Sequence, residues 1–462
     1  MINLHQTESV PVGVVRRPIG EIRCTEPPFH GGLEYTPPAR GHWTIAHTPM
    51  LIPGCHIIFL CASACMRGVV LTALEDGGMD RFSMILLNDH DLYDGKQEEV
   101  MLEGICEIID GLPSRPPMVI PFTSCIHHFL ACDTKYIYRE LRRRYPDIDF
   151  VQGYMIPTIR KGKVSPEQQM QLTLYEALEP QETLDRHAVN VIGSNFALDP
   201  EGDFCRLLGK NGFAIRDLVK MREYREYKDM AKSCANLYCM PVAGLAAADM
   251  EKRLGQKPLF VPATYVPEAI RQELREVAAA FQLEPLDTGP LEEEAEEALA
   301  RAHRILGDIP IALDHECTPL FLSLARLLRS RGFQVKEIYS DYILPGDAEN
   351  LRWLQEKAPD ITFCAANNYR CRLEPRDGRG PFLAIGQKSA YYTGTAHFVN
   401  ILENDGLWGF TGIRKMAERL IRAYETESNV PEIIQVKAWG CNCSAAGMHG
   451  RYPKSGGEKD SP

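Results

Sequence analysis

Three cysteines, Cys24, Cys55 and Cys125, stand alone at the ends of short segments in the first third of this 462-residue chain. Zinc knuckles bind their metal through closely paired cysteines, whereas these three are tens of residues apart. Widely spaced thiols beside apolar strands can be gathered at one rim of a sheet, where they hold an iron–sulfur cluster. Three thiolates leave a [4Fe–4S] cluster one ligand short. A partner chain or a carboxylate then supplies the fourth ligand, or a larger cluster is shared across a subunit interface.

Other cysteines and histidines leave alternatives open. Cys61 and Cys65 are four residues apart, which would place both on one helical face and suit a metal, but their apolar surroundings favour packing. His127 and His128 follow Cys125 and could tune a cluster or relay protons, or form a capped or solvent-facing pair. Cys441 and Cys443 could bind a metal or be exposed thiols. Fifteen cysteines, an odd number in a large chain, do not indicate a disulfide framework.

Composition excludes several classes of protein. The net charge is -11 and the pI about 5.7, so no basic face is expected for nucleic acid or an anionic membrane. The longest apolar stretch, Ile57–Ala64, is far shorter than the roughly 20 residues of a membrane-spanning helix. The N-terminus lacks the basic and apolar regions of a signal peptide. We therefore expect a soluble cytoplasmic protein.

Short apolar or β-branched runs alternate with amphipathic helical stretches, which predicts an α/β fold of three Rossmann-like domains with parallel sheets flanked by helices. An irregular N-terminal arm and a flexible C-terminal tail complete the chain. The predicted parts are the arm (1–45), a first domain with the interface cysteines (46–185), a second (186–300), a third (301–440) and the tail (441–462).

The predicted elements place the candidate residues. A strand over 117–121 follows a helix over Gln97–Gly111 and leads into Cys125. The carboxyl ends of strands form the binding crevice of an open α/β sheet, so Cys125 is expected where ligands bind. Asp314–Cys317 likewise end the first strand of the third domain, where they either face a cavity or have a structural role. A strongly acidic helix that begins near Leu291 is expected to be a solvated face.

The cysteine pattern resembles the component 1 proteins of nitrogenase and its relatives. An early cysteine, the Gly54-Cys55 pair and Cys125 followed by Asp133 fit that family's interface-cluster ligands in order and approximate spacing. The acidic segment Leu87–Gly95 resembles a family segment between the second and third ligands. The resemblance implies three α/β domains, with Cys24, Cys55 and Cys125 as ligands of a [4Fe–4S] or P-cluster-like centre.

A second part of the resemblance concerns Cys239. The sequence Ala235–Cys239 (ANLYC), followed by Met250–Gly255 (MEKRLG), is similar to the α-type subunit around the cysteine that binds one end of its large iron–sulfur cofactor. This implies that Cys239 is a cofactor and metal ligand, the alternative being a buried thiol beside Cys234.

The family's second cofactor ligand is missing. A histidine follows a Pro-Phe segment in nitrogenase, but the matching stretch Pro381–Gln387 contains none, and His397 lies further along the chain. This difference argues against a molybdenum-type cofactor and against dinitrogen as the substrate.

The resemblance implies an α-type catalytic subunit of an ATP-dependent reductase. Such a subunit pairs with a homologous second subunit in an α2β2 heterotetramer and receives electrons from a homodimeric iron–sulfur ATPase. The chain has no G-x-x-x-x-G-K-[ST] sequence, so ATP binds only the partner reductase. A small-molecule substrate such as that of a methylthio-alkane reductase is favoured. The alternatives are a tetrapyrrole reductase subunit, a scaffold for cofactor assembly, or an α/β protein that binds a small ligand without a cluster.

Overall fold

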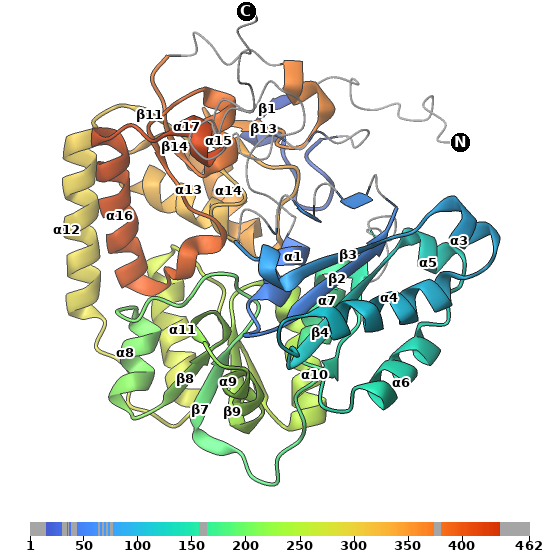
Figure 1. Ribbon diagram of the computed structural model, residues 1–462. Coiled ribbons are helices and arrows are strands. Elements are labelled where there is room, and N and C mark those ends of the chain that lie inside the picture. The colour runs from blue at the N-terminus through green and yellow to red at the C-terminus, as the bar shows by residue number, and fades with distance from the viewer. Residues whose placement is uncertain are drawn as a thin grey trace, which may run out of the picture. The chain divides into compact units, whose positions relative to one another are not determined.

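The computed structural model describes residues 15–29, 35, 37, 44–62, 65–66, 69–70, 73, 77–156, 164–373 and 380–434. Parallel sheets flanked by helices make up the fold, which confirms the predicted α/β class (Figure 1). The chain divides into two compact units. Unit 1 contains residues 1–41, 199–207 and 262–462, and unit 2 contains residues 42–198 and 208–261. The predicted division into three domains, an arm and a tail stays a prediction, and residues 441–462 lie outside the described residues.

The first sheet of unit 2 is parallel and is buried on both faces. Its order is β3-β2-β4-β5, and β6 also pairs with β4. Alternate residues of β2 enter different cores: Ile57 and Phe59 pack in one, and Ile58 and Leu60 in the other with helices α4 and α6. Burial on both faces explains why β2 is an uninterrupted apolar run. The strands are β2 (His56–Cys61), β3 (Phe82–Leu86), β4 (Met118–Ser124), β5 (Asp149–Phe150) and β6 (Gly153–Met155).

Helices accompany this sheet, and Figure 1 shows two of them, α4 and α6, side by side. The predicted helix over Gln97–Gly111 is confirmed at both ends. Asp133 begins α6 as its N-cap and accepts a hydrogen bond from the Tyr136 amide at 3.0 Å. The helices are α1 (Thr44–Met50), α3 (Asp89–Tyr93), α4 (Gln97–Gly111), α5 (Cys125–Phe129) and α6 (Thr134–Arg144).

The second sheet of unit 2 is also parallel, with the order β10-β9-β7-β8. Buried amides join its two central strands: Asn190 Nδ2 donates to Asn236 Oδ1 at 2.8 Å, and Asn236 Nδ2 donates to Gln256 Oε1 at 3.2 Å. The strands are β7 (Asp185–Val191), β8 (Ala214–Asp217), β9 (Ser233–Tyr238) and β10 (Lys257–Phe260). The helices near them in sequence are α7 (Pro166–Leu174), α8 (Asp203–Lys210), α9 (Tyr224–Asp229), η6 (Pro241–Ala243) and α10 (Gly244–Leu254).

Unit 1 contains a six-stranded sheet with the order β1-β13-β12-β11-β14-β15. All pairs are parallel except that of β1 with β13. The predicted irregular arm was therefore wrong at Arg16–Pro18, which form this edge strand. The strands are β1 (Arg16–Pro18), β11 (Pro310–Asp314), β12 (Gln334–Tyr339), β13 (Thr362–Cys364), β14 (Leu383–Ile385) and β15 (Phe398–Val399).

Two long helices of unit 1, α12 and α16, pack side by side (Figure 1). The acidic sequence from Leu291 forms α12, whose carboxylates alternate with a buried face that includes Leu291 and Ala295. Buried Asp203 accepts hydrogen bonds at the start of α16 from the Phe410 amide (2.6 Å) and the Thr411 hydroxyl (2.6 Å). The helices of unit 1 are α11 (Pro267–Ala280), α12 (Gly289–Leu306), α13 (Phe321–Ser330), α14 (Ala348–Lys357), α15 (Gln387–Thr393), α16 (Gly409–Glu425) and α17 (Val430–Ile433).

None of the helices formed by the described residues has the length and apolar character needed to cross a membrane.

Candidate functional site

Cys125 lies at the carboxyl edge of the first sheet. It is the first residue of α5 and directly follows β4, as the sequence predicted. Because β3 and β4 flank β2 on opposite sides, the chain changes direction between β2 and β4. Ligands of open α/β sheets bind at the carboxyl ends of strands beside such a switch point. The half-buried thiol of Cys125 is therefore well placed to hold a ligand.

Cys55 lies at the opposite edge of the same sheet. It directly precedes β2, whose register pairs His56 with Val119, near the start of β4. A strand rises about 3.3 Å per residue, so the length of β4 separates the two edges by about 20 Å. The expectation that Cys55 and Cys125 share one rim is therefore wrong. Burial in the apolar core raises the pKa of the Cys55 thiol to about 12, which keeps it protonated.

Cys65, in contrast, lies just beyond the carboxyl end of β2. Cys61 is the last residue of that strand, so the prediction that Cys61 and Cys65 share a helical face is wrong. The Cys65 amide donates to the Ala62 carbonyl at 3.0 Å, which turns the chain immediately after the strand. Cys65 is exposed, whereas burial raises the pKa of Cys61 to about 12. The neighbouring strands β2 and β4 thus deliver Cys65 and Cys125 to the same edge.

His127 adds an unpaired donor beside Cys125. The Ser124 amide donates to His127 Nδ1 at 3.2 Å, so Nδ1 carries a lone pair and the neutral ring carries its proton on Nε2. His127 is 2% exposed, and its Nε2 has no hydrogen-bond partner among the described residues. Burial lowers the pKa of His127, which favours this neutral ring. His128 is exposed, so only His127 of the predicted pair is held inside the protein.

Cys239 occupies the corresponding position in the second sheet. It directly follows β9, and the chain changes direction between β9 and β7. Cys239 is 1% exposed. Gly193 follows β7 with φ +80°, and a Cβ there would come within 2.3 Å of Ala243 in the turn after Cys239. A glycine is thus required for the two turns beside this switch point to pack together.

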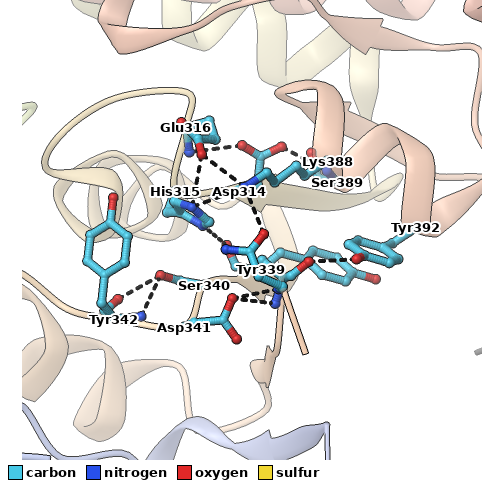
Figure 2. A network of polar contacts seen from close by, with 12 residues as sticks. Asp314, His315, Glu316, Tyr339, Ser340, Asp341, Tyr342, Lys388, Ser389 and Tyr392 are labelled. Carbon is cyan, nitrogen blue, oxygen red and sulfur yellow. Dashed lines mark hydrogen bonds and ion pairs between the residues drawn. The ribbon is translucent and has the colours of Figure 1, made fainter. Parts of the chain in front are cut away.

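The sheet of unit 1 has its own switch point between β11 and β14, where polar side chains converge (Figure 2). Asp314, the last residue of β11, accepts hydrogen bonds from the Ser389 amide at 2.7 Å and the Glu316 amide at 3.0 Å. Gly386 has φ +103°, and a Cβ there would lie 2.3 Å from the Asp314 carboxylate. Burial raises the pKa of Asp314. The glycine lets this carboxylate join the turn after β11 to the start of α15.

Lys388 is the buried cation of this group. Its residue is 1% exposed, and its Nζ donates to Glu316 Oε1 at 2.9 Å and to Asn367 Oδ1 at 3.1 Å. Nζ also lies 3.4 Å from His315 Nε2. His315 Nδ1 lies 3.2 Å from the Tyr339 carbonyl, which can only accept, so Nδ1 is the donor. The sequence suggested a role for Asp314–Cys317 but did not reveal Lys388 or Asn367.

Residues that follow β12 complete the group. Asp341 accepts hydrogen bonds from the amides of Ala366 and Asn367, which fixes the turn that carries Asn367. The Tyr342 ring packs edge-on against His315 with the ring centroids 4.9 Å apart. Burial raises the pKa of Asp341 and of Tyr342. In Figure 2 Tyr342 lies beside the His315 ring and Asp341 lies below it.

The remaining candidates lie elsewhere. Cys24 is half-buried in unit 1, near the end of the segment that contains β1, and burial raises the pKa of its thiol. His397 Nδ1 is 3.0 Å from the Ala423 carbonyl. Cys441 and Cys443 lie outside the described residues. Among the described residues, no three Cys, His, Asp or Glu side chains form a group that could hold a metal ion.

Comparison with known proteins identifies the family. The family model described as "Nitrogenase component 1 type Oxidoreductase" matches residues 49–425. The chain belongs to this family. A solved structure titled "Nitrogenase Cp1 at pH 6.5" is similar with a TM-score of 0.64 and 13% sequence identity, over 87% of this chain and 95% of that chain. "Nitrogenase Cp1 at pH 5" is similar with a TM-score of 0.54 and 13% identity, over 84% and 90%. No curated protein matches the sequence.

Proteins of the nitrogenase component 1 family typically bind iron–sulfur clusters and work with partner subunits and an iron protein. The carboxyl edge of β2 and β4 has groups that fit a cluster. Thiolates are the usual ligands of iron in such clusters, and the unpaired N–H of His127 is the kind of donor that hydrogen-bonds to sulfur. The fit rests on Cys65 and Cys125, whereas Cys55 lies at the other edge.

Proposed function

We propose that this chain is a catalytic subunit of a nitrogenase-like, ATP-dependent iron–sulfur reductase. One observation carries the proposal: a cysteine stands at the carboxyl-edge switch point of each sheet in unit 2, Cys125 in the first and Cys239 in the second. Such positions bind ligands in open α/β sheets, and thiolates are the ligands that iron–sulfur groups need. Membership of the family supports the same reaction class.

The interface cluster would be held by thiolates of this chain together with ligands from a homologous subunit. We assign Cys65 and Cys125 to it from their shared edge, and Cys24 from the resemblance. Cys65 replaces Cys55 in this assignment, because Cys55 lies about a strand length away, at the opposite edge of the sheet. When bound, the cluster accepts and passes on single electrons. The chain's own contribution is to fix the sulfur positions and to donate the His127 N–H, which favours the more negative, reduced state.

Cys239 would hold a second iron–sulfur cofactor or the substrate-binding group. The stretch that matches the histidine segment of nitrogenase, Pro381–Gln387, contains β14 here and is followed by Lys388 in α15. A protonated lysine is not a metal ligand, and Lys388 is already paired with Glu316. This difference supports a substrate other than dinitrogen, such as that of a methylthio-alkane reductase.

The proposed assembly is an α2β2 heterotetramer in the cytoplasm. A homodimeric iron–sulfur ATPase would dock on it and supply electrons, and ATP would bind only that partner, because this sequence lacks a P-loop.

Anaerobic purification with the partner subunit and reductase tests the proposal. We expect iron and acid-labile sulfide in the complex, together with ATP-dependent electron uptake over many turnovers. C239A should abolish turnover, whereas C234A is the matched control, since Cys234 lies on the same strand with a half-buried thiol. A complex without iron, or equal activity in the two variants, would refute the assignment. Turnover is then measured with compounds that contain a carbon–sulfur bond and with tetrapyrroles. Reduction of the first kind indicates a methylthio-alkane reductase type, and reduction of the second kind indicates a tetrapyrrole reductase.

A scaffold for cofactor assembly is the second candidate. The observation that favours it is the buried Lys388–Glu316 pair next to Pro381–Gln387, the stretch that lacks the histidine of the matching nitrogenase segment, because a cofactor anchored by Cys239 alone would be easier to release. A scaffold transfers its cofactor to another protein and does not turn over. Incubation of the iron-loaded chain with a cofactor-free acceptor subunit separates the two, since activation of the acceptor without ATP-dependent turnover favours the scaffold.

A further inference from the structure

The polar group at the β11–β14 switch point contains three groups that can exchange a proton. Lys388 Nζ lies 2.9 Å from Glu316 Oε1 and 3.4 Å from His315 Nε2, and Glu316 Oε1 lies 3.2 Å from the same His315 nitrogen. The three polar atoms therefore form a closed triangle at hydrogen-bond distances (Figure 2).

The tautomer of His315 explains why the triangle shares a proton. Nδ1 donates to the Tyr339 carbonyl, so Nε2 of the neutral ring carries a lone pair. This lone pair can accept a hydrogen bond from Lys388 Nζ. The contact between Nε2 and Glu316 is attractive only when a proton lies on Nε2. One proton can thus reside on Lys388 or on His315 without a change in the total charge of the triangle.

The exposure of the three side chains to solvent differs, as the transfer of a proton from solvent to a buried base requires. The side chains of His315 and Lys388 are 0% and 1% exposed, whereas the Glu316 side chain is 13% exposed. Glu316 therefore connects solvent to the two inner bases. A buried ion pair adds little to stability compared with apolar side chains, so stability alone does not explain this arrangement.

We propose that Lys388, His315 and Glu316 form a proton relay that delivers protons to a group bound at the carboxyl edge of the unit 1 sheet. This inference rests on the proposed reductase function, in which electrons arrive one at a time and must be matched by protons. In each cycle an N–H bond of Lys388 or His315 breaks and a bond from that proton to the reduced substrate forms. A proton from solvent, carried by the Glu316 carboxyl group, then restores the N–H bond. The electrons come from the partner reductase.

Other titratable groups face the triangle and contribute to its charge. They come from the end of β11 and the turn after it, and from the turn after β12. These groups are Asp314, Cys317, Asp341 and Tyr342.

Two variants separate a relay from a structural ion pair. K388R keeps the positive charge and the pairing with Glu316, but a guanidinium does not release its proton. E316Q keeps an oxygen that accepts from Lys388 but cannot carry a proton. E337Q is the matched control, because Glu337 is a buried carboxylate of the same sheet that pairs with Arg16 at 2.8 Å.

The first experiment uses the full chain without a cluster. The ring nitrogens of His315 are followed against pH by nitrogen-15 NMR in wild type, K388M and E316Q. We expect the ring to hold its proton to higher pH in K388M, because a neighbouring cation is removed, and to release it at lower pH in E316Q. Identical curves in all three proteins would overturn the shared proton, whatever reaction the assembled complex performs.

The second experiment uses the complex with its reductase. We expect K388R and E316Q to lower turnover by about 100-fold, the size of a general acid–base contribution, and to raise the solvent deuterium isotope effect relative to E337Q. Normal turnover in K388R would overturn the relay. A coupled His315 titration in a complex that shows no ATP-dependent reduction would instead refute the proposed function and leave the shared proton in place.

Discussion

The unpaired N–H of His127 gives the sharpest test of the cluster site in unit 2. In H127L this donor is removed, together with the Nδ1 lone pair that accepts from the Ser124 amide at 3.2 Å. H128L is the matched control, because His128 is the next residue and is exposed. Only H127L should change a cluster held by Cys125.

The expected size follows from the burial of the ring. A buried N–H without a partner among the described residues costs about 1–3 kcal/mol, and the helix-cap contact to Ser124 contributes about 1 kcal/mol. In the cluster-free protein these two effects oppose each other, so H127L should change the free energy of unfolding by less than about 2 kcal/mol. In the loaded protein, losing an N–H···S bond worth about 1 kcal/mol to the reduced state should lower the one-electron midpoint potential by about 40 mV.

Two measurements check the prediction. Urea unfolding of the cluster-free chain gives the stability change, and anaerobic redox titration of the loaded complex gives the potential. A potential in H127L equal to that in H128L would show that Nε2 does not contact the cluster. A loss of stability above about 3 kcal/mol in the cluster-free H127L would show that the ring has a partner in the protein, which would also refute the reasoning.

Three further predictions follow from individual residues. C65A should lose iron and sulfide from the interface cluster while C55A keeps them, as measured by anaerobic metal analysis; the reverse result would restore the original assignment. D203A should lower the free energy of unfolding by about 2–4 kcal/mol because the start of α16 loses its acceptor, whereas D203N should lose less, and equal values in urea unfolding would contradict this. Burial lowers the pKa of His56 below 6.5, so the unfolded chain takes up the proton first and stability should fall as the pH drops below 6.5, by up to about 1.4 kcal/mol per pH unit. H56Q should show a smaller slope than the wild type when unfolding is compared at pH 5.5 and 7.5, with a remainder from His127, whose pKa burial also lowers.

The order and limits of many elements could be predicted from the sequence because local signals agree there. The helix over Gln97–Gly111 has a regular apolar face, and α12 has acidic residues that alternate with buried alanines and leucines. The arm was harder to predict. Arg16–Pro18 have no strand pattern of their own, and they are extended because they pair with β13, which lies far away in the sequence.

The candidate cluster site shows a different limit. A cysteine beside an apolar run can lie at either end of the strand, and only the end after the strand belongs to the binding edge of a parallel sheet. Cys55 precedes the run that becomes β2, whereas Cys65 follows it. The sequence contains this information, because the apolar stretch begins at Ile57, after Cys55 and before Cys65.

The relay group could not be predicted, because its partners come together only through the fold. Lys388 is separated from Glu316 by 72 residues and from Asn367 by 21. A local signal was the lysine in the second position of α15, shortly after the buried strand β14, where a solvated side chain would not be expected. Placing an ammonium at such a position is costly unless a carboxylate accompanies it. The pairing with Glu316 removes much of that cost, and the contact of both groups with His315 gives the buried proton a path that an isolated ion pair would lack.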